Sequence, residues 1–365
     1  MQRWINYIRK KPIAVLLSGI PLVILAEYLH WGEIWIFAFS TIAIIPLAGY
    51  IGEATEELAH YTGPRLGGLL NATLGNAAEL IITITAIRAG LLDLVKASIT
   101  GSILGNLLLV LGMAILLGGL KNGHQTFDRR QATNNSILLV LTILTLLVPS
   151  LFSHYIGEET SIKVEALSLG TALVMILLYG LGLIYSYKSL PDAGPITPEY
   201  ENAMNQKHNR GGWSARTALI VLGVATVGVA WMSEILVASV EPVVAAVGIS
   251  EFFIGIIFIP IIGNVAEHLV AVQVAIRNKM TLSVEIAVAS SLQIALFVAP
   301  VLVFLSLALG HPLTLIFNQL ELVALIAGVL IAALVSADGE SNWLEGAELL
   351  AIYFILGLAF FLLPV

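Results

Sequence analysis

The sequence predicts an all-α polytopic membrane protein with eleven transmembrane helices and an inverted internal repeat. The first observation is composition: of 365 residues, 58% are hydrophobic and 11% are charged, and the mean hydropathy is +0.94. Soluble domains carry about 25% charged residues. The second and third observations are the regular spacing of long apolar runs and a motif that occurs twice. Together they indicate a chain with little mass outside the bilayer.

Apolar runs long enough to cross a membrane follow one another along most of the chain. A helix needs about 20 residues to cross the hydrocarbon core. The first run follows the basic segment Met1–Lys11 but lacks the small-residue cleavage site of a signal peptide, so we expect a retained helix. The expected spans are 12–30, 33–59, 66–88, 93–118, 132–152, 163–187, 214–240, 251–276, 282–308, 316–336 and 343–364.

One polar segment separates the chain into two halves. Lys188–Trp213 contains Pro191, Pro195 and Pro198 together with charges of both signs, which is typical of a linker. The expected organisation is an N-terminal transmembrane helix over 1–31, a first half over 32–187, a cytoplasmic linker over 188–213 and a second half over 214–365.

The distribution of basic residues predicts the orientation. With the N-terminus in the cytoplasm, fourteen of the 17 lysine and arginine residues fall on the cytoplasmic side of the eleven spans. Only Arg88, Lys96 and Lys163 fall on the other side. Cytoplasmic loops are enriched in Lys and Arg. We therefore expect an integral multi-pass protein with its C-terminus on the opposite side, in the cell membrane if the source is prokaryotic.

Two copies of one motif carry the functional argument. Gly75–Arg88 reads GNAAELIITITAIR, and Gly263–Arg277 reads GNVAEHLVAVQVAIR. The copies fall on the third and eighth expected spans, an odd number of spans apart, so they cross the membrane in opposite directions. Inverted repeats with a site at their midplane junction are typical of secondary transporters.

Each copy places one carboxylate, Glu79 or Glu267, near the middle of an apolar run. A charged side chain there costs about 2.5–3.5 kcal/mol on insertion scales, so a functional role is the default interpretation. Each carboxylate follows a Gly-Asn pair, which weakens a helix and can free backbone carbonyls. The alternative, that each Glu only hydrogen-bonds a neighbouring helix, explains the duplication poorly.

Two carboxylates with neutral oxygens suit a hard divalent cation such as Ca²⁺, which takes about 6–8 oxygen ligands. For the serines among the candidates, helix–helix packing is an alternative role, because small residues let helices approach closely. No resident cofactor is expected, since the cation is the cargo. The candidate ligands are Glu79, Glu267, Asn76, Asn264, Ser102, Ser290, Ser291, Gln293 and Asn106.

The same carboxylates can carry protons. Burial and mutual repulsion both favour the neutral form of a carboxyl group, and the pair would titrate as a unit. A divalent cation that enters would expel protons, and protons would expel the cation. We therefore expect the affinity for the cation to fall as the pH falls.

A second acidic pair lies away from the midplane. Glu53 is expected near the inner end of span two and Glu234 near the outer end of span seven, where they would relay protons or cations toward opposite faces. His268 either tunes the adjacent carboxyl group or is a satisfied hydrogen-bonding residue. Glu56 and Glu57 are expected at a solvated helix end. The candidate proton pathway comprises Glu79, Glu267, Glu53, Glu234 and His268.

Composition also excludes several classes of protein. The chain has no Cys, which excludes disulfides, thiolate metal sites and thiol redox chemistry. No basic patch is large enough for nucleic-acid binding. The expected partners are Ca²⁺ and H⁺ as substrates and the lipid bilayer, and a homo-oligomer is left open.

The two motifs, with GSILGN at 101–106, SSLQIALFVAP at 290–300 and GEATEELA at 52–59, resemble those of the calcium/proton exchangers (CAX type) of the Ca²⁺/cation antiporter superfamily. The resemblance covers the length of the chain. It implies one extra N-terminal helix plus two inverted five-helix repeats, and a cation and proton site at Glu79 and Glu267. The mixed charge of Pro191–Arg210 departs from the acidic linker helix of that family.

These observations predict a secondary active transporter, not an enzyme, that exchanges Ca²⁺ for H⁺ by alternating access. The sodium/calcium branch has Ser-Leu-Pro-Glu where this chain has Asn-Ala-Ala-Glu, which favours a proton counter-ion. The alternatives are the same fold with Na⁺ as counter-ion or another divalent cation as cargo, a channel with a carboxylate selectivity ring, and an intramembrane enzyme. The chain has no His-Glu-x-x-His string of a zincin, and Tyr61 stands where a glutamate-based membrane protease needs Arg.

Overall fold

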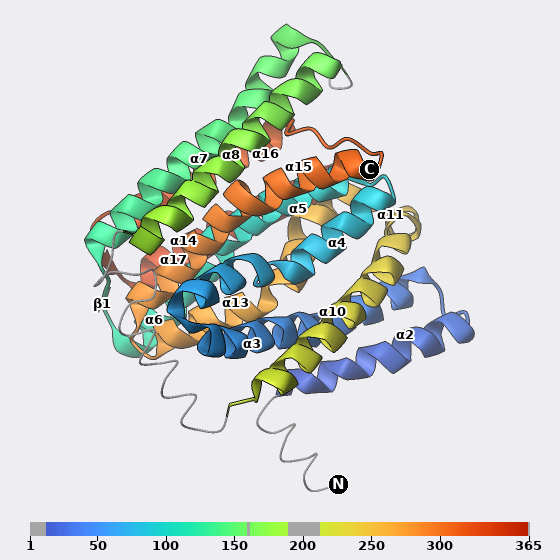
Figure 1. Cartoon of the computed structure of the whole chain (residues 1–365), viewed down its shortest axis with the longest axis horizontal. Helices are drawn as coiled ribbons and strands as arrows, with labels where there is room; N and C mark the ends of the chain where they lie inside the picture. The colour runs from blue at the N-terminus through green and yellow to red at the C-terminus, as the bar shows by residue number, and fades with distance from the viewer. Residues whose placement is uncertain (1–11, 159–160, 189–211, 364–365) are drawn as a thin grey trace, which may run out of the picture.

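The protein, described here from a computed structural model, is a bundle of long helices that lie side by side (Figure 1). The structure describes residues 12–158, 161–188 and 212–363. Met1–Lys11 and the stretch 189–211 of the predicted linker lie outside the described residues. The helices are η1 (Pro12–Ser18, 3₁₀), α2 (Gly19–Tyr28), α3 (Glu33–Leu74), α4 (Ala77–Arg88), α5 (Leu92–Leu104), η2 (Gly105–Val110, π), α6 (Leu111–Asn122), α7 (Arg129–Ile156), α8 (Ile162–Lys188), α10 (Ala215–Ala238), α11 (Val240–Val247), α12 (Glu251–Phe253), η3 (Ile254–Phe258, π), α13 (Ile259–Ile276), α14 (Met280–Gln293), η4 (Ile294–Val298, π), α15 (Ala299–Ala308), α16 (Gln319–Val335) and α17 (Trp343–Phe361).

Eight helical stretches among the described residues are long and apolar enough to cross a membrane, and two shorter apolar helices cover Ile13–Tyr28 and Gln319–Val335. Local sequence explains where several of them begin. Asn318 and Asn342 each form a capping box with the Glu three residues later, which satisfies free N–H groups at the starts of α16 and α17. Ser214 caps α10 through the backbone N–H of Thr217.

The expected turn between the second and third spans is present, but as a sharp bend inside α3. A Cβ placed on Gly67 would lie 2.8 Å from the Cβ of Ala59. Residues eight apart in a straight helix are about 12 Å apart at 1.5 Å per residue. The chain therefore reverses between Ala59 and Gly67 while it stays helical, and Figure 1 shows α3 curling back into α4. The expectation of a solvated helix end at Glu57 was wrong, because this side chain is only 8% exposed.

The two Gly-Asn pairs behave differently. Gly75 and Asn76 separate α3 from α4, as expected of a helix-weakening pair. Gly263 and Asn264 lie inside α13, which continues without a break to Ile276. The helix-weakening Gly-Asn pair therefore interrupts a helix in the first copy only.

Among the described residues one short strand pair accompanies the helices, and the all-α prediction missed it. β1 (Gln125–Thr126) and β2 (Glu340–Ser341) pair antiparallel, with Gln125 opposite Ser341. Each strand has only two residues, too few to carry a hydrophobic periodicity, so the sequence pattern could not predict the pair. It joins the loop after α6 to the loop before α17.

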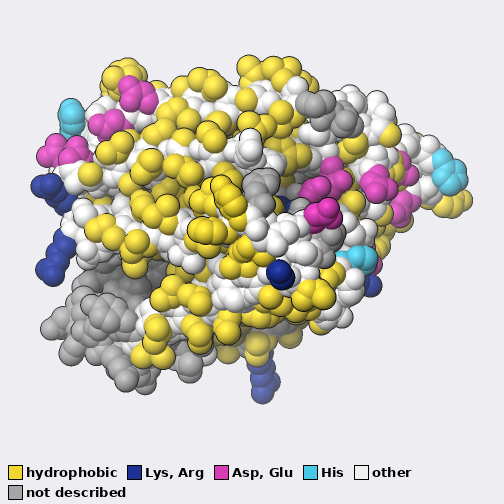
Figure 2. Space-filling model, turned by 90° about the horizontal axis from the view of Figure 1, so that it is seen from above, with side chains coloured by type: hydrophobic (Ala, Val, Ile, Leu, Met, Phe, Trp, Pro, Cys, Tyr) yellow, Lys and Arg dark blue, Asp and Glu magenta, His cyan; other side chains and the backbone are white. Residues whose placement is uncertain are grey.

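The surface is what a bilayer requires. In Figure 2 hydrophobic side chains cover the middle of the molecule, and most charged side chains gather toward its two ends. Large apolar side chains such as Leu141 and Leu144 on α7, and Leu177 and Leu181 on α8, are more than half exposed. A contiguous apolar surface of this kind is unusual for a soluble monomer. These side chains are therefore placed to face lipid.

Hydrogen bonds identify the two ends of the bundle. At one end, which we call the linker-side end, Tyr61 Oη donates to the carbonyl of Trp213 (2.8 Å), and Gln125 Nε2 donates to the carbonyl of Ala275 (2.9 Å). At the other end, which we call the far end, the N–H of Leu94 donates to Glu251 Oε1 (3.1 Å). These contacts join the two halves of the chain at both ends.

Small residues let the two halves cross closely in the middle. A Cβ on Gly101 of α5 would overlap the carbonyl of Ile256 in η3, and one on Gly255 would lie 2.8 Å from the Cβ of Ala97. Close approach of helices through Gly and Ala is typical of membrane proteins. The π turn η2 follows Ser102 within three residues, and η4 follows Gln293 directly, so both irregular turns border the same central region. π turns inside α-helices are frequent at functional sites.

Candidate functional site

The two motif copies meet in the centre of the bundle. A Cβ on Gly263 would lie 3.3 Å from the Cβ of Glu79, and a Cβ on Gly75 would lie 3.3 Å from Glu267 Oε1. The glycine of each copy therefore borders the glutamate of the other. Residues 188 positions apart in the chain thus share one site.

Glu79 is buried among polar side chains. Its side chain is 1% exposed, and Ser102 of α5 donates a hydrogen bond to Oε1. Asn264 of the second copy reaches across: its Nδ2 lies 3.4 Å from Glu79 Oε2 and 3.4 Å from Ser102 Oγ. One residue of the second half therefore binds both polar groups of the first half.

Glu267 has a matching but more open environment. Ser290 Oγ of α14 donates to Glu267 Oε2 at 2.6 Å. Ser290 follows Glu267 by 23 residues, the same interval that separates Ser102 from Glu79. The side chain of Glu267 is only partly buried, whereas that of Glu79 is fully buried. Both copies of the motif therefore contain the serine–carboxylate pair, but the carboxylate of the second copy is more accessible to water.

Amide side chains complete the centre. Asn76 Nδ2 donates to Gln293 Oε1 at 2.9 Å, a second bond between the halves. Among the described residues, Asn264 Oδ1 and Asn106 Nδ2 are buried and have no hydrogen-bond partner. A buried acceptor without a donor is costly in a dry interior. Asn264 Oδ1 is therefore an oxygen that a cation would satisfy.

Two predicted site residues, Ser291 and His268, are buried nearby. Ser291 Oγ donates to the carbonyl of Ala287 in its own helix (3.0 Å), which fits the packing alternative for this serine. His268 is 6% exposed on α13, directly after Glu267. The ligand role of Ser291 and the proton role of His268 stay predictions.

The second acidic pair lies in two different environments. Glu53 is partly buried on α3, and a Cβ on the preceding Gly52 would lie 3.8 Å from the Cβ of Ala266, next to Glu267. Glu234 is exposed at the far end and pairs with Arg88 at 3.6 Å. Glu53 thus borders the central site, while Glu234 lies at the surface.

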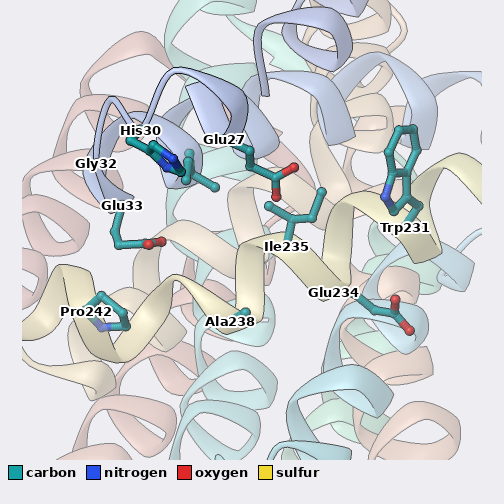
Figure 3. Close-up of a pocket in the computed structure, with 10 residues that line it drawn as sticks. Glu27, His30, Gly32, Glu33, Trp231, Glu234, Ile235, Ala238 and Pro242 are labelled. Carbon is teal, nitrogen blue, oxygen red and sulfur yellow. The ribbon is translucent and has the colours of Figure 1, made fainter. Parts of the chain in front are cut away.

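Glu234 also lines a cavity of about 590 Å³ at the far end. Figure 3 shows Glu27 of α2, His30 of the following turn and Glu33 at the start of α3 around this cavity, together with Glu234 of α10. Sequence reasoning missed Glu27, His30 and Glu33, because none of them belongs to the repeated motif. The one sequence feature that could have pointed to them is their position beside a short turn between two apolar runs.

The donor set of the centre suits a hard cation only if neutral oxygens contribute. Among the described residues, no group of three or more Asp, Glu, His or Cys side chains is arranged as a metal site. Two carboxylates, two serine hydroxyls and amide oxygens are nevertheless available in the centre. Such all-oxygen sets are what Ca²⁺ prefers, and they are unsuited to soft metals.

Comparison with known proteins assigns the family. The family model described as "Sodium/calcium exchanger protein" matches residues 32–188 and 217–362. The chain belongs to the sodium/calcium exchanger protein family. Within this exchanger family, the chain is 48% identical to a "Ca(2+)/H(+) antiporter" of Aphanothece halophytica, over 96% of each chain. It is 45% identical to the "Ca(2+)/H(+) antiporter ChaA" of Bacillus subtilis (strain 168), over 95% of this chain and 97% of that protein.

Solved structures of exchangers share the fold. The structure of native YfkE has 43% sequence identity and a TM-score of 0.82, and the alignment covers 96% of this chain and 100% of that chain. The structure of the "H+/Ca2+ Exchanger CAX" has 16% identity and a TM-score of 0.71, over 96% of this chain and 92% of that chain. The second likeness shows the fold alone. The chain is therefore a multi-pass helical membrane protein of an exchanger family.

Proposed function

We propose that this protein is a secondary active transporter that exchanges Ca²⁺ for H⁺ by alternating access. The observation that carries the proposal is the meeting of Glu79 and Glu267, from the two copies of one motif, in a buried site rich in oxygen acceptors. Relatives named Ca²⁺/H⁺ antiporters at 48% and 45% identity over nearly the whole chain support the choice of both ions.

Both carboxylates and the neutral oxygens that surround them would coordinate the cation. Asn264 Oδ1, which has no donor among the described residues, would turn from an unsatisfied acceptor into a ligand. The hydroxyls that now donate to the carboxylates would rotate and present lone pairs. The proposed ligand set is Glu79, Glu267, Asn76, Asn264, Ser102, Ser290, Gln293, Asn106 and, with the packing alternative noted above, Ser291.

Protons and the cation would compete for the same oxygens. A protonated carboxyl group has lost the charge that binds a divalent cation, and a bound cation displaces the proton. The empty, doubly charged site is costly to move through a low-dielectric interior. The carrier would therefore change sides with either the cation or protons bound, which couples the two fluxes.

The proposed architecture is eleven helices, with α2 as the extra N-terminal helix and two inverted five-helix repeats over 32–187 and 214–365. The two segments matched by the family model, 32–188 and 217–362, support this division. The proposed orientation places the linker-side end in the cytoplasm. Glu53 would serve the linker-side pathway with His268, and Glu234 the far-end pathway through the cavity of about 590 Å³.

The test is Ca²⁺ uptake into proteoliposomes driven by a pH jump. We expect uptake by the unmodified protein and near-complete loss in Glu79→Gln and in Glu267→Gln, which keep the side-chain volume and remove the charge. Ca²⁺ uptake that does not depend on the pH jump, or that is unchanged in both variants, would contradict the proposal.

The same vesicles separate the proposal from its alternative within the family. An imposed Na⁺ gradient without a pH difference should not drive Ca²⁺ uptake. If it does, the counter-ion is Na⁺ and the proton assignment is wrong. Replacing external Ca²⁺ with Mn²⁺ measures the selectivity among divalent cations.

A further inference from the structure

Four ionisable side chains lie on one face of α3 between the central site and the linker-side end. Glu53, Glu56, Glu57 and His60 are spaced i, i+3, i+4 and i+7, the spacing of one helix face. Two like charges at i and i+4 repel each other. Packing between apolar helices does not require a row of ionisable side chains such as this one.

Glu57 is the unusual member of this stripe. Its side chain is 8% exposed, and among the described residues its Oε2 atom is buried without a hydrogen-bond donor. A Cβ on Gly212, the first described residue after the stretch 189–211, would lie 2.7 Å from that oxygen. An acidic oxygen is therefore enclosed beneath the backbone at Gly212 and lacks a partner in the part of the chain that the structure describes.

The stripe leads from the centre to the surface. Gly52, directly before Glu53, packs against Ala266, which is adjacent to Glu267. One residue beyond His60, Tyr61 Oη donates to the carbonyl of Trp213 at 2.8 Å. Glu57 lies between these two contacts, one helical turn from Glu53. It is thus placed where a cation would pass on its way between the central site and the linker-side face.

We propose that Glu57, with Glu53 one turn away, forms a second cation-binding station in the linker-side pathway, covered by Gly212 and Trp213. The inference rests on the proposed transport function. A divalent cation that keeps part of its water shell would satisfy the enclosed oxygen of Glu57 and relieve the repulsion between the two carboxylates. A side chain at position 212 would collide with this carboxylate, because its Cβ would lie 2.7 Å from Glu57 Oε2 and 3.3 Å from Oε1, so only glycine lets the backbone cover Glu57 this closely.

A direct binding test uses Tb³⁺, a luminescent substitute for Ca²⁺ that is excited by energy transfer from a nearby indole. Trp213 is the adjacent antenna. In the full-length Glu79→Gln/Glu267→Gln protein, which lacks the central carboxylates, we expect Tb³⁺ luminescence excited through tryptophan and displaced by Ca²⁺. Adding Glu57→Gln should weaken Tb³⁺ binding about tenfold, because the number of charged ligands sets the affinity.

Three further variants make the result specific. Trp213→Phe should remove most of the luminescence while ⁴⁵Ca²⁺ binding stays unchanged. Glu57→Asp, which keeps the carboxylate, should retain Tb³⁺ binding even if Glu57→Gln proves unstable. Glu340→Gln removes an exposed charge at the same end and should change nothing. Equal Tb³⁺ titrations with and without the Glu57→Gln substitution, or no tryptophan-excited signal in the double variant, would overturn the proposal.

Transport supplies the second readout. In proteoliposomes, Glu57→Gln should raise the Ca²⁺ concentration for half-maximal uptake about tenfold from the linker side, with no change from the far side. An equal change on both sides would assign Glu57 to the general stability of the protein and overturn the proposal. If the unmodified protein exchanges no Ca²⁺ while Tb³⁺ still binds at Glu57, only the proposed function fails. If exchange is present and binding at Glu57 is absent, only the station fails.

Discussion

At the scale of single residues, the site combines a repeated pattern with an asymmetry. Ser102 and Ser290 hydrogen-bond the two carboxylates at equal sequence intervals, as a repeated motif leads one to expect. Asn264, however, contacts Glu79 and Ser102 of the other copy, while Asn76 contacts Gln293. Glu79 is consequently the enclosed carboxylate and Glu267 the one with more access to water.

Asn264 therefore offers a prediction at this scale. Asn264→Ala removes the oxygen Oδ1 and the bond to Glu79, so we expect the affinity for Ca²⁺ to fall about tenfold, the equivalent of about 1.4 kcal/mol. Equilibrium binding of ⁴⁵Ca²⁺ to the purified protein measures this. Asn134→Ala, on an exposed position of α7, is the matched control. Equal affinities in the two variants would mean that Asn264 is not a ligand.

At the scale of elements, the close crossing of α5 and η3 holds the site together. Gly101 lies directly before Ser102, and no side chain fits between it and the backbone of Ile256. The crossing brings Ser102 to Glu79 and brings Pro260, one turn before Asn264, against α5. A change in helix spacing at this point would separate the two halves of the site.

Gly101→Ala tests the crossing. The added methyl group would meet the Ile256 carbonyl and lie 2.7 Å from Pro260 Cγ, so we expect destabilisation of about 1–3 kcal/mol from overpacking. Thermal unfolding in detergent measures it. The control Gly180→Ala lies in α8 with no atom within 4 Å of the new methyl group, and should be neutral or stabilising by up to about 1 kcal/mol. Unfolding temperatures that do not differ would show that the helices can separate without cost.

The start of α16 gives a second prediction for an element. Glu321 is 3% exposed, completes the capping box with Asn318 and accepts a hydrogen bond from Thr100 at 3.1 Å. Glu321→Ala should cost about 1–3 kcal/mol of stability, because it leaves a buried hydroxyl and a helix start unsatisfied. Glu345→Ala, in the similar capping box of α17, should cost about 1 kcal/mol.

Calcium affinity distinguishes this structural role from a role in transport. We expect it to be unchanged in Glu321→Ala once the variant is folded, since Glu321 already has two hydrogen-bond partners on α5 and at the start of α16. A loss of ⁴⁵Ca²⁺ binding without a loss of stability would place Glu321 among the transport residues instead.

At the scale of the whole molecule, the sequence predicted what depends on local pattern. The apolar runs gave most helices to within a few residues, for example 163–187 against Ile162–Lys188, and the repeated motif identified the two carboxylates that meet. Burial of Glu57 beside Gly212 and the β1–β2 pair depend on contacts between distant segments. No periodicity encodes such contacts, so they required the structure.

The orientation of the whole molecule is a prediction that labelling can check. The chain has no Cys, so single cysteines can be introduced without a background. Glu340→Cys at the linker-side end should react with a membrane-impermeant maleimide only from the cytoplasmic side, and His311→Cys at the far end only from the other side. Both positions are exposed. Labelling of both from one side would refute the proposed topology.

The central claim is that one pair of carboxylates holds either a divalent cation or protons. The most direct measurement is the proton release that accompanies Ca²⁺ binding to the purified protein in weakly buffered solution, recorded with a pH indicator. The account predicts that Ca²⁺ binding releases protons from the unmodified protein, and that Glu79→Gln and Glu267→Gln release fewer protons. If two protons are displaced, the affinity for Ca²⁺ should weaken by up to about 100-fold for each unit by which the pH falls. Tight Ca²⁺ binding with no proton release and no dependence on pH would contradict it.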